Sequence, residues 1–194
     1  MSSNIVRNSL YEGRRALHEQ IGLEAELHVC EQLCKIFDKN RIYHGLPGYS
    51  GTDGQPDIFV RSPYGPLFIE VKSIRPFYRA YRKTKTKLRR TGYWKPGSAK
   101  LNKEAWANLK KLSMDQLTQI FIIVDLRFRK EDRRVDLLLT EDQIDRFVAK
   151  STGKSWVHVS LSELMNNGLV LDYMSDPFKE RIKDKDFKQQ QLTR

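Results

Sequence analysis

Apolar residues recur along this chain in two periods, one typical of helices and one typical of strands. From Ile21 to Phe37 they recur at every fourth position, as on one face of a helix, and we expect that helix over about residues 14–37. Short runs rich in Ile, Val and Phe predict strands. Further helices are expected at 99–113, 140–150 and 160–168, and strands at 41–44, 119–126, 135–139 and 155–160, with a hairpin within 55–73. This order predicts an α/β fold with a central mixed sheet flanked by helices.

The hairpin QPDIFVRSPYGPLFIEVKS carries the most informative polar residues. With the turn centred on its Pro-Tyr pair, facing residues have numbers that sum to 127, so Asp57 lies directly opposite Glu70. Opposed carboxylates destabilise a strand pair, and a cation between them reverses that effect; carboxylate oxygens suit Mg²⁺ or Mn²⁺. Lys72 shares a face with Glu70 because side chains alternate along a strand. The hairpin is therefore either a metal-binding acidic pair with an ammonium beside it or an ordinary pair of strands whose polar residues face water.

Other polar residues are candidates to complete this site. Glu26 lies at the edge of the helix face expected to meet the sheet, and it is either a third carboxylate of the site or a side chain that extends past the core into water. Asp125 ends the predicted strand at 119–126 and is either a further ligand or a turn residue. The glycine-rich loop GLPGYSGTDG leads to Asp57, permits close approach of a phosphate backbone, and contains Ser50 as a hydrogen-bond donor.

The length and composition indicate one domain. The chain has 194 residues, of which 39% are hydrophobic and 30% charged, and we expect a domain at 1–174 followed by a charged tail at 175–194. No apolar run approaches the ~20 residues of a membrane span, and the first residues lack the apolar core of a secretion signal, so we expect an intracellular protein without a membrane partner. Cys30 and Cys34 form no disulfide framework or zinc pattern and are expected to pack as small apolar residues.

The net charge of +11 and the pI of about 9.7 favour a polyanionic partner. Residues 75–98 form a basic insert that interleaves aromatic residues and contains no acidic residue. Lys and Arg neutralise phosphates, and aromatic rings stack on unpaired bases, so we expect this insert to bind nucleic acid rather than to be an ordinary solvated face, and to be disordered until nucleic acid binds. The expected DNA-binding residues are Arg75, Arg79, Arg82, Lys83, Lys85, Lys87, Arg89, Arg90 and Lys95.

The motifs in this order resemble those of the PD-(D/E)XK nuclease superfamily. The resemblance covers roughly residues 20–126, and the family's Glu, Asp, Glu and Lys would fall on Glu26, Asp57, Glu70 and Lys72. Within the superfamily, YSGTDGQPDIFV is similar to the glycine- and serine-bearing loop and second motif of archaeal Holliday junction resolvases. That similarity implies an active-site role for Ser50 as well. The basic insert is longer than this family leads us to expect, which leaves the choice of substrate open.

The resemblance implies a restriction-endonuclease-like core and Mg²⁺-dependent hydrolysis of DNA phosphodiester bonds. Asp57, Glu70 and the carbonyl of Val71 would hold Mg²⁺, with Mn²⁺ as a substitute, and Glu26 would bind directly or through water. Lys72 would either position or deprotonate the attacking water, which requires a lowered pKa, or contact the scissile phosphate as a charged ammonium. Both roles of Lys72 stay open at this point.

The implied substrate is structured or branched DNA such as a four-way junction. A homodimer is expected, because two-fold symmetry suits a substrate that needs two symmetric cuts. One alternative is a nuclease for flaps, ends or a specific sequence. Another is a non-catalytic DNA-binding protein that keeps the fold, although such a protein has no need of two carboxylates that repel each other.

Overall fold

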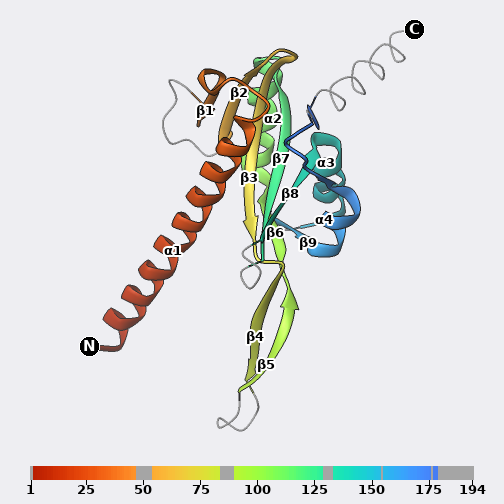
Figure 1. Ribbon diagram of the computed structural model, residues 1–194. Helices are drawn as coiled ribbons and strands as arrows, with labels where there is room; N and C mark the ends of the chain where they lie inside the picture. The colour runs from red at the N-terminus through yellow and green to blue at the C-terminus, as the bar shows by residue number, and fades with distance from the viewer. Residues whose placement is uncertain are drawn as a thin grey trace.

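A six-stranded mixed sheet forms the centre of the molecule (Figure 1). The computed structural model describes residues 2–46, 54–83, 90–128, 133–153, 155–175 and 177–178, with their side chains except at 2–15, 78–83 and 90–94. In spatial order the strands are β1 (Ile42–His44), β2 (Ile58–Ser62), β3 (Gly65–Ile74), β7 (Gln119–Phe128), β8 (Arg133–Thr140) and β10 (Leu169–Val170). Strands β3 and β7 run parallel, and the other neighbouring pairs are antiparallel. The expected α/β class with a mixed central sheet is therefore confirmed.

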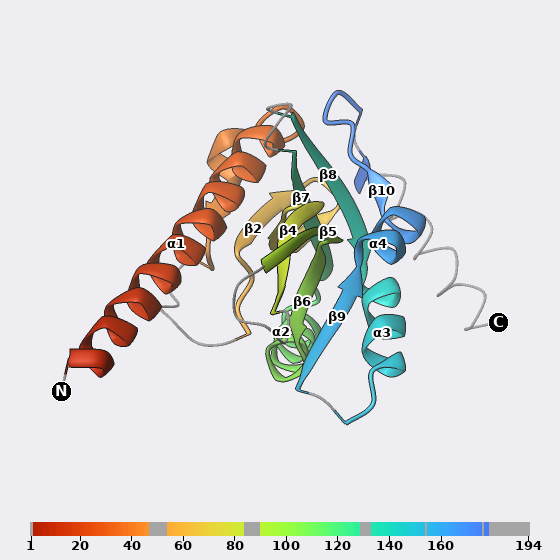
Figure 2. The same cartoon turned by 90° about the horizontal axis from the view of Figure 1, so that it is seen from below.

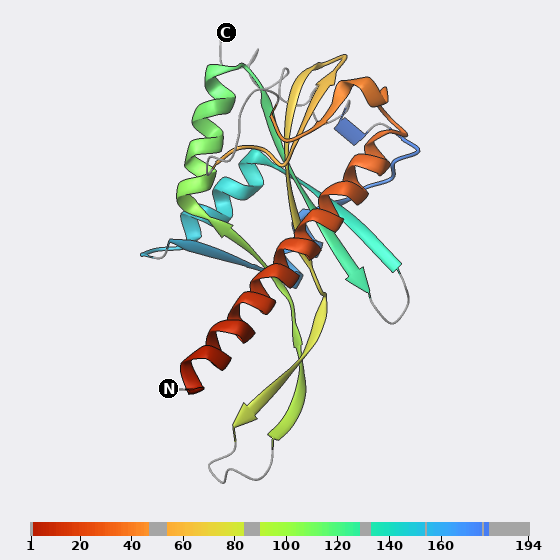
Figure 3. The same ribbon diagram turned by 90° about the vertical axis from the view of Figure 1, so that its left-hand side faces the viewer.

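Helices cover both faces of this sheet (Figure 2). Helix α1 (Ser2–Leu33) lies on one face, and the short 3₁₀ helix η1 (Lys39–Arg41) follows it. The opposite face is covered by α2 (Lys103–Asp115), α3 (Glu141–Lys150), α4 (Leu161–Asn167) and a two-stranded sheet of β6 (Ser98–Asn102) and β9 (Trp156–Ser160). A second two-stranded sheet, β4 (Phe77–Lys83) with β5 (Arg90–Pro96), projects from the end of β3 (Figures 1 and 3).

Strands β3 and β7 are buried on both faces, which explains their nearly continuous apolar sequences. Side chains alternate between the two faces, so Val71 packs in the α1 layer with Val29, whereas Phe68 packs in the α2 layer with Leu109. The polar residues of β3 that follow Phe68 at intervals of two, Glu70 and Lys72, consequently lie on the α2 side of the sheet.

Two local predictions are confirmed by the structure. In the β2–β3 hairpin Ile58 pairs with Ile69, and the two-residue loop is closed by the pair Ser62 and Gly65, so facing residues do sum to 127. Helix α3 begins with a capping box in which the backbone of Thr140 is bound by the side chain of Gln143 at 2.8 Å.

Several predicted boundaries are wrong. Helix α1 begins at Ser2, well before residue 14, and ends at Leu33, so Cys34 lies in the following turn and is exposed instead of packed. The helix expected at 99–113 begins only at Lys103, because the preceding residues pair with β9 as strand β6. Asn102 caps the helix there by accepting hydrogen bonds from two backbone amides, at 2.9 and 3.2 Å. No helix in the described ranges is long and apolar enough to cross a membrane.

The described parts of the expected insert and tail have defined structure. The described part of the basic insert is the β4–β5 hairpin, so its backbone is regular without nucleic acid. Phe178, in the segment expected as a tail, is buried against Phe37 and Phe121, with ring centroids 5.7 and 5.3 Å apart. The core therefore extends past residue 174.

The base of the β4–β5 hairpin is fixed by a close backbone approach at Gly97. Its amide donates to the carbonyl of Pro76 at 2.8 Å, and its carbonyl accepts from the amide of Leu161 at 3.2 Å. A Cβ added at Gly97 would lie 2.1 Å from the carbonyl oxygen of Arg75. Only glycine allows the two ends of the hairpin to pass this closely.

Replacing Gly97 by Ala should therefore destabilise the fold. We expect a loss of about 1–3 kcal/mol in the free energy of unfolding, because backbone atoms must separate to admit the methyl group. Urea titration measures it. The matched control is Gly22→Ala in α1, where φ is not positive and the nearest atom to an added Cβ is 3.9 Å away, so no stability should be lost. Equal losses for both variants would show that the close approach is relieved without cost.

Candidate functional site

The candidate site lies where strands β2 and β3 separate. Strand β2 begins at Ile58, opposite Ile69, whereas β3 continues to Ile74 and remains paired with β7. Asp57 occupies the edge of β3 that β2 leaves uncovered, and its Oδ2 accepts a hydrogen bond from the amide of Val71 at 2.6 Å. The register brings Asp57 to the position opposite Glu70, as predicted, although Asp57 itself stands just outside the strand.

The carbonyl of Val71 lies on the same edge of β3 as its amide. In a strand the N–H and C=O of one residue point to the same neighbour, and the Val71 amide points to Asp57. The backbone oxygen expected as a ligand is therefore directed to the side on which Asp57 lies. The Val71 side chain is buried in the α1 layer and takes no part in the site.

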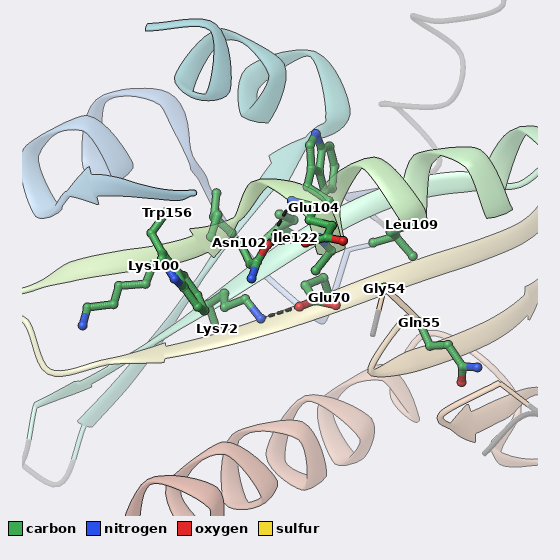
Figure 4. Close-up of a pocket in the computed structure, with 13 residues that line it drawn as sticks. Gly54, Gln55, Glu70, Lys72, Lys100, Asn102, Glu104, Leu109, Ile122 and Trp156 are labelled. Carbon is green, nitrogen blue, oxygen red and sulfur yellow. Dashed lines mark hydrogen bonds and ion pairs between the residues drawn. The ribbon is translucent and has the colours of Figure 1, made fainter. Parts of the chain in front are cut away.

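Glu70 and Lys72 form an ion pair beside this edge, on the α2 side of the sheet (Figure 4). Nζ of Lys72 donates to Oε1 of Glu70, and both side chains are partly buried. Burial lowers the pKa of Lys72, but the charges of Glu70 and Asp57 more than offset it, so the net pKa is raised. The amine is therefore a charged ammonium at neutral pH.

Asp57 has the most perturbed carboxyl group of the site. Burial and then the charge of Glu70 raise its pKa to about 7, although Lys72 and the Val71 amide act in the opposite direction. The site thus holds two acids that one ammonium does not fully compensate. A divalent cation would favour the ionised form of both, and oxygen donors of this kind are those that Mg²⁺ prefers.

Glu26 approaches the site from α1. Its Oε2 lies 2.6 Å from Nε2 of His44, on β1, and its charge contributes to the raised pKa of both Asp57 and Lys72. Glu26 is thus within electrostatic reach of the other predicted residues. The partner His44 was not anticipated, because nothing in the sequence links strand β1 to the middle of α1.

In their described positions these acids are bound to protein partners. Glu70 contacts Lys72, and Glu26 contacts His44. Within the part of the chain that the structure describes, no three His, Cys, Asp or Glu side chains are grouped so as to hold a metal ion. Asp57, Glu70 and the Val71 carbonyl are the groups with suitable oxygen donors, and the charge of Glu26 acts on this site from α1.

One candidate residue, Asp125, is not brought to this centre. Asp125 lies within β7 and not at its end, fully buried on the α1 side, and its Oδ2 accepts from Nε of Arg127 at 2.6 Å. Arg127 in turn reaches α1 through Glu24 and the carbonyl of Ile21, at 2.8 and 2.9 Å, so Asp125 anchors a helix and is neither ligand nor turn residue. Ser50 lies outside the described residues.

The expected DNA-binding residues follow β3 along the chain. Arg75 and Lys95 are exposed at the base of the β4–β5 hairpin. The backbone of Arg79, Arg82 and Lys83 is in β4 and that of Arg90 in β5. The described ranges do not include Lys85, Lys87 and Arg89.

A cavity of about 290 Å³ opens beside Glu70 and Lys72. Its other polar and aromatic lining residues were not among the predicted ones, and they are Gln55, Lys100, Asn102, Glu104, Trp106 and Trp156. They come from segments distant in sequence, namely the residues before β2, strands β6 and β9, and helix α2 (Figure 4). For two of them the sequence holds a signal, because Lys100 and Trp156 each stand next to an apolar strand residue, Leu101 and Val157, and must therefore face the other side of the strand.

Gly54 allows α2 to approach the segment that leads to Asp57. It has a φ of +92°, and a Cβ there would lie 2.4 Å from Cβ of Asn108. Glycine is therefore required for two reasons, its backbone conformation and the lack of space for a side chain.

Comparisons with models of known protein families, with curated proteins and with solved structures gave no match.

The raised pKa of Asp57 predicts a pH-dependent effect of Asp57→Asn on stability. A carboxyl whose pKa is higher in the folded protein, here about 7 against the ordinary value of 3.8, destabilises the fold progressively as pH rises between these values. In EDTA at pH 8 the variant should be more stable than the wild type by about 2–4 kcal/mol, at ~1.4 kcal/mol per pKa unit. At pH 4 the difference should disappear.

Urea unfolding of both proteins between pH 4 and pH 8 measures this. The Asn side chain keeps an acceptor for the Val71 amide, so the hydrogen bond is preserved. A variant that is less stable than the wild type at pH 8 would contradict the assigned repulsion between Asp57 and Glu70.

Proposed function

We propose that the protein is a metal-dependent DNA endonuclease with a restriction-endonuclease-like core of the PD-(D/E)XK type. The observation that carries the proposal is the open edge of β3, where Asp57 and the Val71 backbone lie next to the Glu70–Lys72 ion pair. The favoured substrate is structured or branched DNA such as a four-way junction. The proposal rests on the geometry of these groups together with the resemblance of their motifs.

The oxygen donors at this edge fit Mg²⁺, for which Mn²⁺ can substitute. Asp57, Glu70 and the Val71 carbonyl would hold the ion, and Glu26 would complete the set directly or through water. The pKa of Asp57, raised to about 7 by burial and by Glu70, supports the fit because a cation would offset that repulsion. When bound, the ion would lower the pKa of a water molecule and offset negative charge in the transition state.

The scissile phosphate is the favoured target of Lys72. Without a bound ion, the charges of Glu70 and Asp57 raise the pKa of Lys72, so that the amine is protonated at neutral pH and acts as a donor. An ammonium has three N–H donors, of which Glu70 takes one. The remaining donors can bind a phosphate oxygen and stabilise the charge that develops on it.

The β4–β5 hairpin supplies a surface for the rest of the DNA. Five of the expected DNA-binding residues stand in its two strands, and they are Arg79, Arg82, Lys83, Arg90 and Lys95. The hairpin projects away from the central sheet (Figure 3), so its strands are separated from the layer of α2, α3 and α4. Its positive charge would contribute affinity independently of sequence.

A homodimer belongs to the proposal because two symmetric cuts require two sites. Helix α1 offers a surface for a second copy, since Leu23 and Leu27, four positions apart on one face, are 47% and 50% exposed. A nuclease for flaps, ends or a specific sequence has the same chemistry and remains the nearest alternative. A non-catalytic DNA-binding protein is disfavoured by the partly buried acidic pair.

Cleavage of four-way junction DNA in Mg²⁺ should depend on Glu70 and Lys72. We expect Glu70→Gln and Lys72→Ala each to lower the single-turnover rate by about 10²–10³-fold, because each removes a group that acts on the transition state. Gel analysis of the products from junction, flap and plain duplex DNA measures the rate and the preferred substrate.

The matched control is Lys111→Ala, which removes an exposed lysine of α2. It should cleave at the wild-type rate, and EDTA should abolish cleavage by every protein. Equal background cleavage by the wild type and Glu70→Gln would exclude the enzyme, and retained junction binding in that case would favour the non-catalytic alternative.

Metal binding should also be detectable without DNA. At pH 8, Mg²⁺ at about 100 times its dissociation constant should stabilise the wild type by ~2.7 kcal/mol, because only the folded chain assembles the donors. Thermal unfolding in Mg²⁺ and in EDTA measures the shift in Tm. Asp57→Asn and Glu70→Gln should lose most of it, and an equal shift in all three proteins would mean that the ion binds elsewhere.

A further inference from the structure

One wall of the cavity beside Lys72 is formed by the small β6–β9 sheet, which lies largely outside the motifs discussed above. Its inward residues, including Leu101 and Val157, are buried in the α2 layer. The alternation of side chains therefore turns Lys100 and Trp156 outward, and both line the cavity. Figure 4 shows them at the end of the cavity where Lys72 lies, whereas Gly54 and Gln55 lie at the other end.

Trp156 differs from the other tryptophan that lines this cavity. Trp106 is 6% exposed, and its indole N–H donates to Asp145 at 2.9 Å, so it belongs to the core. Trp156 is 49% exposed and also lines a neighbouring cavity of about 410 Å³. A large aromatic ring between two hollows offers a flat surface to a ligand and contributes little to the core.

The position of Trp156 is fixed by the start of α2. The amide of Lys103 donates to the carbonyl of Ser155 at 2.9 Å, and its Nζ donates to the carbonyl of Ser151. Asn102, which faces Trp156 across the two strands, caps α2. The ring therefore stands on a rigid support, which reduces the entropy lost when a ligand stacks on it.

The charges in the cavity decide where an anionic ligand fits. Glu70 and Glu104 line its middle and disfavour a phosphate there. Lys72 and Lys100 lie on either side of Trp156 at this end of the cavity, with the amine of Lys72 directed to Glu70 and that of the exposed Lys100 directed away from it. A ligand with one phosphate and one flat apolar ring matches this end, and a nucleotide has both parts.

We propose that Lys100 and Trp156 form a subsite for an unpaired nucleotide next to the scissile phosphate. Lys100 contacts the phosphate of that nucleotide, and the indole of Trp156 stacks on its base. A base in a continuous duplex is stacked on its neighbours and is not free to do so. The subsite thus selects DNA with unpaired or distorted bases, and it rests on the proposed function while specifying its substrate class.

Binding in EDTA tests the subsite separately from catalysis. The probes are a fluorescein-labelled single strand, a forked duplex with unpaired arms, and a plain duplex of the same length, each titrated by anisotropy. We expect Trp156→Ala to weaken binding of the first two by about tenfold, as stacked bases contribute on alanine substitution, and to change duplex binding by less than ~2-fold. Trp156→Phe should retain most of the affinity, and Lys100→Ala should weaken binding and lower its salt dependence.

Met165→Ala is the matched control, because it removes an apolar side chain on α4 that is 50% exposed and lines neither cavity. It should bind all three probes like the wild type, and circular dichroism should show that each variant is folded. Three results would overturn the subsite and leave the proposed nuclease intact. They are an equal loss of affinity for duplex and single strand, no loss of affinity with Trp156→Ala, and a change in oligomeric state without a selective loss of affinity. A wild type that binds none of the probes would overturn both, whereas tenfold selective loss combined with no cleavage by any protein would retain the subsite and exclude the enzyme.

Discussion

The hydrogen bond from the Val71 amide to Asp57 is the contact on which the site depends. Strand β2 begins at Ile58, opposite Ile69, so it leaves the edge of β3 after Ile69 unpaired in a partly buried place. A buried amide without a partner destabilises a fold. Asp57 supplies that partner but brings a carboxylate close to Glu70. The geometry that completes the sheet therefore also buries Asp57 beside Glu70, and burial and then the charge of Glu70 raise the pKa of Asp57.

The same contact sets the charge balance of the site. With Glu26, Asp57 and Glu70 ionised and Lys72 protonated, these four side chains carry a formal charge of −2, that is, three negative charges and one positive. A divalent cation matches this number. The ion pair between Lys72 and Glu70 then has two consequences, since it keeps Lys72 protonated and holds Glu70 beside the open edge of β3.

The parts of the site that follow from the sequence are local. The register of the hairpin is fixed by a two-residue turn, so the relation of Asp57 to Glu70 can be predicted from numbering alone. Strand β6 could not be predicted, because its partner β9 lies more than 50 residues away and only that pairing overrides the helical spacing of Leu101. Asp125 was misassigned for a related reason: its charge is neutralised by Arg127 from the same strand, so the strand continues where the sequence turns polar.

Strand β3 links the chemistry of the site to the basic hairpin. It carries Glu70 and Lys72, and only Arg75 and Pro76 separate it from β4, while the returning strand is held against the same two residues at Gly97. A short connection pinned on both sides leaves the base of the hairpin little freedom relative to the ion pair. In the proposed function, DNA bound along the hairpin therefore approaches the β2–β3 edge in a restricted orientation, and Trp156 lies beside that approach on a support anchored to α2. Selection of a distorted substrate then requires no movement of the central sheet, because the basic hairpin continues directly from β3 and Trp156 is already held beside α2.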